Sequence, residues 1–226
     1  AVGAFNLRQQ SSFGAAVTAL TISGATLNFD LGSSGSDLLA VGVGKAAISG
    51  TNIIDLNLLG SSLSNGTYDL ITANQGLTGT FQFSSGLTKQ TVSLSGTAYA
   101  LSLLNFATAQ QINVSTPVAL TWTGQTSGNG VADSSWNDSG SSNWADGSGV
   151  GSATNYVNGV GVTFQDVNAV SGSNVTNLTV TIQAAGVSPT SVLFNNSAVN
   201  YTVANASGTV GITGTAGLTK QGTGTV

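Results

Sequence analysis

The feature that most constrains the fold is a succession of short runs in which apolar and polar residues alternate. In residues 26–31 (TLNFDL), leucine, phenylalanine and leucine occupy every second position, and residues 52–59 (NIIDLNLL) show the same alternation. A period of two places the apolar side chains on one face of a strand, so each run predicts a strand with one buried face. Turns containing glycine, such as Ser23-Gly24 and Asn65-Gly66, separate the runs.

Runs of this kind cover most of the chain and predict an all-β fold. We expect strands at residues 17–22, 26–31, 38–43, 52–59, 67–72, 79–83, 91–95, 98–104, 118–124, 160–164, 176–183, 190–194, 198–203 and 208–213. The only segment with a helical pattern, and that a weak one, is residues 8–16.

Internal similarity narrows the architecture. The tripeptide Ile22-Ser23-Gly24 recurs 26 residues later as Ile48-Ser49-Gly50, and again as Leu94-Ser95-Gly96. The pentapeptide at residues 86–90 (GLTKQ) recurs unchanged at residues 217–221. A spacing near 26 residues suits one turn of a β-helix, so we expect a β-solenoid, parallel β-helix-like, of short rungs. The alternative fold is a pair of β-sandwiches divided near Pro117.

The same features suggest how the chain is organised. Residues 1–16 form an N-terminal extension that could dock on, or be exchanged with, another chain. Residues 17–117 form a first β region. Residues 118–226 form a second, which contains a loop at 124–159 rich in Trp, Asn and Asp.

Composition excludes several function classes. The chain has no His and no Cys, and all eight acidic residues are Asp. A thiolate zinc site, a histidine-based triad and a disulfide are therefore excluded. Four basic residues cannot form the clustered positive face that binds nucleic acid. No run of about 18 apolar residues could cross a membrane as a helix.

Composition also indicates where such a protein works. The chain lacks Cys, and Asn, Thr and Ser take the place that Lys and Glu usually occupy on a protein surface. These features favour a bacterial protein that is secreted or displayed on the cell surface. The sequence has no initiator Met and no signal peptide, so we expect a mature or excised piece of a longer product.

Several segments resemble a known family. Residues 217–226 (GLTKQGTGTV) resemble the opening of the autotransporter-associated β-strand repeat, although the second half of that repeat does not follow. Residues 120–124 (LTWTG), with Trp136-Asn137 and Asn143-Trp144, are similar to a stretch that precedes the repeat in very large secreted bacterial proteins. Residues 36–71 resemble the rung before it. The resemblance implies a repetitive β-solenoid surface or secreted protein with an adhesive or structural role.

The tryptophans of the second region are the first candidate site. Trp136 and Trp144 could stack on sugar rings and make the chain a surface adhesin or glycan-binding module. The alternative is that both rings are buried and pin the long loop to the solenoid. Trp122 lies in a strand-like run and is expected in the core.

Oxygen-bearing side chains in the same loop are a second candidate. They are Asp133, Asn137, Asp138, Asn143 and Asp146. Calcium takes six to eight oxygen ligands, so the cluster could form a calcium site, the one cofactor that the sequence suggests. Their spacing does not match an EF-hand. A polar turn whose side chains bond their own backbone is the simpler interpretation.

Catalysis finds little support in the sequence, and we expect no enzyme. The remote alternative is a β-helix enzyme acting on polysaccharides, with Asp30, Asp55 and Asp69 stacked on successive rungs.

The ends of the chain suggest self-assembly. A stack of rungs exposes unpaired strand edges unless it is capped, and the sequence shows no obvious cap at either end. We expect neighbouring copies to join end to end or by strand addition, as subunits of an extracellular fibre, sheath or surface layer. The residues expected at the junctions are Ala1, Val2, Phe5, Leu7, Thr223, Thr225 and Val226.

Overall fold

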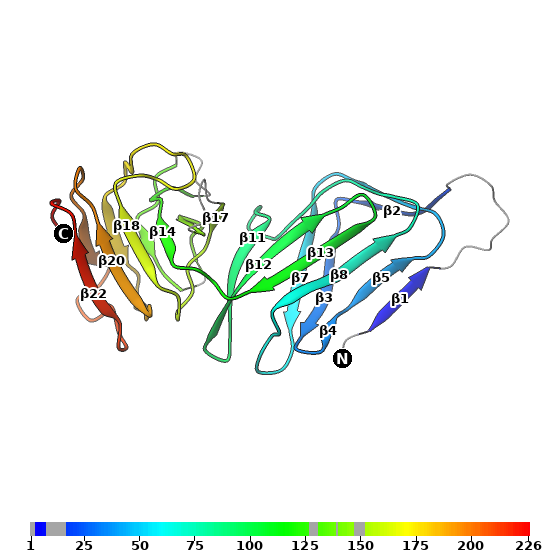
Figure 1. Cartoon of the computed structure of the whole chain (residues 1–226), viewed down its shortest axis with the longest axis horizontal. Helices are drawn as coiled ribbons and strands as arrows, with labels where there is room; N and C mark the ends of the chain where they lie inside the picture. The colour runs from blue at the N-terminus through cyan, green and yellow to red at the C-terminus, as the bar shows by residue number, and fades with distance from the viewer. Residues whose placement is uncertain (1–2, 8–16, 127–130, 139, 147–151) are drawn as a thin grey trace. The chain divides into compact units, whose positions relative to one another are not determined.

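A computed structural model describes residues 3–7, 17–126, 131–138, 140–146 and 152–226. The described residues form strands and turns without an α-helix, and stacked parallel strands form a β-solenoid of about seven turns (Figure 1). The predicted fold class is therefore confirmed. Residues 8–16, with their weak helical pattern, lie outside the described part. Nothing in that part is a helix that could cross a lipid bilayer.

The chain divides into two compact units. The first comprises Ala1–Lys89 and Leu101–Ser115, and the second comprises Gln90–Ala100 and Thr116–Val226. The strands of the first unit are β1 (Ala4–Leu7), β2 (Thr18–Ser23), β3 (Thr26–Gly32), β4 (Gly35–Ser36), β5 (Leu38–Val41), β6 (Lys45–Ser49), β7 (Asn52–Leu58), β8 (Gly66–Ala73), β9 (Leu77–Thr78), β10 (Phe81–Gln82) and β13 (Ala109–Ser115). The strands β11 (Lys89–Leu94) and β12 (Thr97–Asn105) belong in part to each unit.

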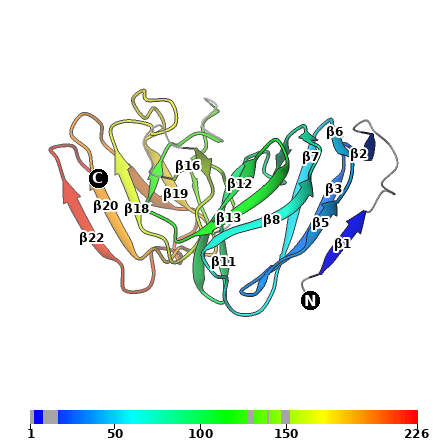
Figure 2. The same ribbon diagram turned by 45° about the vertical axis from the view of Figure 1, so that its right-hand side comes forward.

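Three parallel ladders form the turns of the first unit. In one of them β1, β5 and β8 lie side by side, with Phe5 opposite Leu39 and Leu39 opposite Ile71 (Figure 2). The others consist of β2, β6 and β9, and of β3, β7 and β10. Each turn therefore contributes one strand to each of three sheets, and this unit completes three turns.

The first sequence echo marks successive turns, as predicted. Ile22 lies opposite Ile48 in the parallel ladder, and Ser23 lies opposite Ser49. The glycines that follow turn the corner with positive φ, 56° at Gly24 and 66° at Gly50. The third echo has another role, because Ser95 and Gly96 form the tight turn between β11 and β12.

One corner of the third turn requires glycine for lack of space. Gly79 has a φ of 100°, and a Cβ added there would lie 2.6 Å from the Cβ of Ile48 in the turn below. Any larger residue would force the two turns apart. The close approach of successive backbones at this corner therefore depends on glycine.

An antiparallel strand covers the last turn of the first unit. β13 pairs with β8 from Ala109 opposite Thr72 to Val114 opposite Gly66, with an irregularity between Gln110 and Gln111. β12 continues the same sheet beyond β13. The edge of β8 is thus satisfied within the unit, and the parallel ladder stops there.

The second unit repeats the solenoid plan with a different core. Its strands are β14 (Leu120–Trp122), β15 (Ser135–Trp136), β16 (Trp144–Ala145), β17 (Ala153–Thr154), β18 (Val162–Gln165), β19 (Thr179–Ile182), β20 (Ser191–Asn195), β21 (Thr202–Asn205) and β22 (Gly217–Gln221). One sheet places β14, β18, β20 and β22 in parallel succession, and Figure 1 shows the last three as neighbours. A second sheet stacks β15, β19 and β21 in parallel.

These parallel ladders exclude the β-sandwich alternative, which would pair its strands mainly in antiparallel fashion. Most predicted strands occur near their expected positions. The structure adds several strands, among them β6 and β13, whose Ala-rich and Gln-rich sequences carry weak strand signals. It also adds β15, β16 and β17 within residues 124–159, which were expected to form a loop. Residues 208–213 contribute only a parallel bridge from Ile212 to Val187.

Candidate functional site

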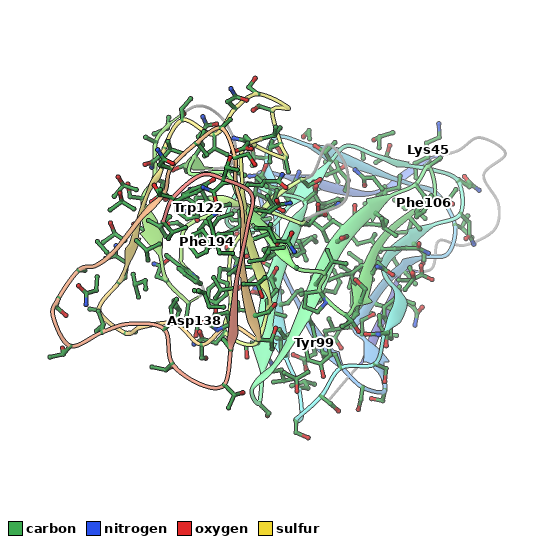
Figure 3. The ribbon with its side chains drawn as sticks, turned by 60° about the vertical axis from the view of Figure 1, so that its left-hand side comes forward. Lys45, Tyr99, Phe106, Trp122, Asp138 and Phe194 are labelled. Carbon is green, nitrogen blue, oxygen red and sulfur yellow. The ribbon has the colours of Figure 1, made fainter. Side chains whose placement is uncertain are left out.

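The three tryptophans form one buried aromatic cluster in the second unit. Trp122, Trp136 and Trp144 each have 0% of their surface exposed. The Trp122 and Trp144 ring centroids are 5.0 Å apart in an edge-to-face arrangement, and Trp136 lies 5.6 Å from Trp144. The cluster extends through Tyr156, Phe164, Phe194 and Tyr201. Figure 3 shows Trp122 and Phe194 inside the ribbon of this unit.

The glycan-contact prediction for Trp136 and Trp144 is therefore wrong. A sugar can stack only on an exposed ring face, and neither ring offers one. The alternative interpretation, burial that fixes the long loop, describes the structure. β15 and β16 carry these residues from the loop onto the two sheets, where β15 pairs with β19 and β16 pairs with β14.

The oxygen-rich side chains of the loop hold the backbone in place. The Oδ1 atoms of Asp133 and Asn137 accept hydrogen bonds from the amides of Ser135 (2.8 Å) and Ser141 (3.1 Å). Three further contacts involve Asp138 Oδ1 with the Asn158 amide at 2.9 Å, Asp146 Oδ1 with the Ser152 amide at 3.2 Å, and Asn143 Nδ2 with the Ser135 carbonyl at 2.6 Å.

The structure does not bring these five residues together as a calcium site. Within the described ranges no three acidic side chains gather closely enough to hold a metal ion. Each carboxylate instead points to a different backbone amide. The geometry matches the polar-turn interpretation, in which Asx side chains stabilise an irregular loop.

The proposed stack of Asp30, Asp55 and Asp69 is also wrong. The inward column of Leu27 against Ile54 sets the register of β3 and β7. That register places Asp30 opposite Asn57, whose Nδ2 donates to Asp30 Oδ1 at 2.8 Å, and Asp55 opposite Asn28. Asp69 lies on β8, in a different sheet. Aspartates two positions out of register cannot form a column.

A carboxylate that the sequence did not single out ties two turns together. Asp166 follows β18, and its oxygens accept hydrogen bonds from three successive amides of the next turn, those of Ser197, Ala198 and Val199, at 3.0–3.1 Å. These bonds lower the pKa of Asp166. Asp37 does the same in the first unit, where it accepts from the amides of Asp30 and Gly3 and its pKa is lowered.

Two buried tyrosines complete the polar side of the aromatic cluster. The hydroxyl of Tyr201 donates to the carbonyl of Gln165 at 2.7 Å, and the hydroxyl of Tyr156 donates to Asn158 Oδ1 at 3.2 Å. Burial raises the pKa of both phenols, and the nearby carboxylates of Asp166 and Asp138 raise it further. Both side chains therefore stay neutral at physiological pH and serve the core.

Among the edge strands of the described sheets, β1 and β22 carry strongly exposed apolar side chains, and these two edges are the remaining candidate site. β1 is the first strand of its sheet and β22 is the last of its own. Phe5 on β1 is 64% exposed and Leu218 on β22 is 67% exposed. Such edges can pair with another strand.

The structure locates most of the predicted junction residues. Phe5 and Leu7 lie on β1, whereas Ala1 and Val2 fall outside the described ranges. Thr223, Thr225 and Val226 follow β22 without forming a strand. Instead the Thr225 carbonyl accepts from the Tyr201 amide at 3.0 Å, so the tail lies along the preceding turn.

Beside β1 is a hollow of about 530 Å³, lined by β1, β3 and β5. Its walls include Phe5, Leu27, Phe29 and Leu39, and Asp37 also borders it. Of these residues Phe5 is exposed, whereas Phe29 is only 5% exposed. Sequence alternation could place these residues on inward faces, but it could not show that a hollow remains between them.

Comparisons with protein-family models, with curated proteins and with solved structures found no match to this chain.

Proposed function

We propose that the chain is a structural segment of an extracellular fibre, sheath or surface layer, secreted by or attached to a bacterial cell. In this role the solenoid supplies length and rigidity, and neighbouring copies join through their open turns. The resemblance of residues 217–226 to the autotransporter-associated strand repeat is in keeping with it.

The observation that carries the proposal is the contrast between covered and exposed strand edges. β13 covers β8, and β16 covers β14. Every residue of β22 is exposed, including Leu218 at a position that is buried in the preceding strand as Val192. An exposed apolar residue on an edge strand favours pairing with another strand.

The chemistry of the surface supports the same role. Charged residues make up only 5% of the sequence, so neighbouring copies experience little repulsion. The carboxylates with identified contacts bond to backbone amides or to side chains of adjacent turns. The adhesin alternative gains no support, because the rings proposed to bind glycans are buried.

Electron microscopy of the purified chain tests the proposal. We expect filaments or ordered sheets at concentrations near 1 mM, and an average mass in sedimentation that rises with protein concentration. Unfolded protein must be excluded by a circular dichroism spectrum typical of β-structure. A folded chain that stays monomeric over the whole concentration range would refute the structural role.

A further inference from the structure

We propose that the second unit is an acceptor of N-linked sugars, and that the sugars are attached to Asn174 and Asn195. The donor is a sugar carried on a diphosphate, and the acceptor atom is Nδ2 of each side chain. This modification goes beyond the proposed structural role and does not depend on it.

The motif that accepts such sugars is concentrated in one segment of the second unit. N-linked sugars are attached to Asn in the sequence Asn-x-Ser/Thr, where x is any residue except Pro. Between residues 174 and 207, five of the six asparagines stand in this motif, compared with three of the other fourteen in the chain. The five are Asn174, Asn177, Asn195, Asn200 and Asn205.

Two of these motifs present their amide and their hydroxyl to the solvent together. The middle residue of each, Val175 or Asn196, is buried, with 3% and 0% of its surface exposed. The burial of the middle residue leaves the two outer residues on the surface. The exposed pairs are Asn174 with Thr176, and Asn195 with Ser197.

The carboxamides of Asn174 and Asn195 are also unconstrained. Within the described residues, neither side chain makes a hydrogen bond. A transferase must bring Nδ2 against the anomeric carbon of the sugar, and at these two sites it breaks no bond to do so. Asn200 differs, because its Oδ1 accepts a hydrogen bond from the Thr225 amide at 2.8 Å.

In two other motifs of the segment, the acceptor nitrogen itself is already bonded. Nδ2 of Asn177 donates to the carbonyl of Gly124 and to Oγ of Ser134, both at 3.2 Å, and the side chain is half-buried. Nδ2 of Asn205 donates to the carbonyl of Val210 at 2.9 Å. Transfer to either nitrogen would first have to break these bonds, so the same motif predicts different outcomes at different sites.

The surroundings of the two acceptor sites leave room for a bulky group. Asn195 ends β20 and lies opposite Gln165 of β18 and Gln221 of β22, whereas its neighbour Phe194 belongs to the buried aromatic cluster. Asn174 lies between β18 and β19. A sugar at either site therefore stands in the solvent and leaves the core unchanged.

The transfer forms one bond and breaks one. Nδ2 attacks the anomeric carbon, and the bond between that carbon and the diphosphate oxygen breaks, with its electron pair leaving on the phosphate. Nδ2 loses one proton to a basic group of the transferase. A nucleotide-linked donor adds a single sugar residue, whereas a lipid-linked donor adds an assembled oligosaccharide, so the added mass separates the two sources.

Peptide mapping by mass spectrometry, on protein purified from the cells that produce it, tests the proposal. We expect sugar on Asn174 and Asn195, and each of the variants Asn174→Gln and Asn195→Gln should lose one attached sugar. The matched control, Asn205→Gln, removes an exposed motif of the same kind and should leave the sugar mass unchanged. Protein without sugar, or with sugar on Asn205 and none on the two proposed sites, would overturn the proposal.

A reaction with purified components provides a second measurement. The folded chain, made in cells without a transferase, is incubated with uridine diphosphate glucose and a transferase that recognises the motif. Synthetic peptides that span each motif serve as the unfolded reference, and all of them should accept glucose. In the folded chain we expect transfer to Asn174 and Asn195 to be roughly tenfold faster than to Asn177 and Asn205, where bonds must break. Equal rates at the four sites would overturn the assignment. Filament formation is measured separately, so neither result decides the structural role.

Discussion

In the second unit, the first and last strands of the parallel stack β14, β18, β20 and β22 differ in how far their residues are buried. At one end, all three residues of β14 are buried, with Trp122 in the aromatic cluster. At the other end, all five residues of β22 are exposed. The strands between them, β18 and β20, alternate buried and accessible residues as a solenoid wall should. Within the described residues the stack is therefore closed at β14 and has an exposed edge strand, here called its open end, at β22.

The difference shows what closes a solenoid. At the closed end, segments of the long loop cover β14. The strands β16 and β17 extend the sheet beyond β14 in antiparallel fashion, and Trp136 on β15 packs into the aromatic cluster. The loop that the sequence suggested as a binding site is a cap made of aromatic residues. The open end has a short tail that follows the turn below it and leaves β22 at the edge.

The largest effect is expected at the closed end. Trp122→Ala would remove a fully buried ring that contacts Trp144 and whose Nε1 donates to the Asn177 carbonyl at 3.0 Å. We expect the free energy of unfolding of the second unit to fall by about 3–5 kcal/mol. Urea denaturation followed by far-ultraviolet circular dichroism measures the change.

Phe106→Ala is the matched control, because Phe106 is an exposed aromatic residue and its truncation leaves no cavity. The expected change is within about 0.5 kcal/mol. If Trp122→Ala cost no more than this control, the aromatic cluster would not close the stack.

Much of the fold could be predicted because strand alternation and the repeat spacing can be read directly from the sequence. Alternation identified the inward residues of β3 and β7, and the 26-residue echo identified Ile22 and Ile48 as partners in successive turns. Alternation alone cannot reveal pairing direction or caps. The antiparallel cover of β8 by β13 depends on contacts between segments more than 35 residues apart in sequence.

The repeated pentapeptide shows the limit of local rules. Residues 217–221 form the strand β22, whereas the identical residues 86–90 turn after Phe83 and only then enter β11. Five identical residues thus adopt two structures, because the surrounding turns differ. The glycan-contact prediction failed for the same reason, since burial of Trp136 and Trp144 depends on pairing with strands distant in sequence, β19 for Trp136 and β14 for Trp144.

A smaller effect is expected midway along the stack, at the link between β18 and the turn after β20. The pKa of Asp166 is lowered because its carboxylate accepts bonds from Ser197, Ala198 and Val199. The unfolded chain therefore binds this proton more readily than the folded chain does. The stabilisation is complete above the ordinary Asp pKa of 3.8 and is lost as the pH falls through the lowered value.

Asp166→Asn should therefore lower the melting temperature by a few degrees at pH 6 and by progressively less as the pH falls through the lowered pKa of the native carboxyl. Thermal unfolding between pH 6 and pH 2 measures this difference. Asp37 contributes in the same direction, so the variant should retain part of the pH dependence. An equal loss at both pH values would mean that the charge of Asp166 does not link the turns.

The smallest effect on the free energy of unfolding is expected for a substitution at the open end. It is compared with a substitution of the neighbouring residue in the same inward column. Val192 is buried in β20, and its register partner Leu218 is exposed in β22. Val192→Ala should lower the free energy of unfolding by about 2 kcal/mol, because it removes buried methyl groups and leaves a cavity. Leu218→Ala should change it by less than about 0.5 kcal/mol, although leucine loses more atoms.

Urea denaturation at micromolar concentration compares the two variants as monomers. If neighbouring copies join at β22, as the proposed structural role requires, raising the protein concentration should make the unaltered chain more stable relative to Leu218→Ala. A large cost of Leu218→Ala at the lowest concentration would show that the end of the stack is already covered in the single chain.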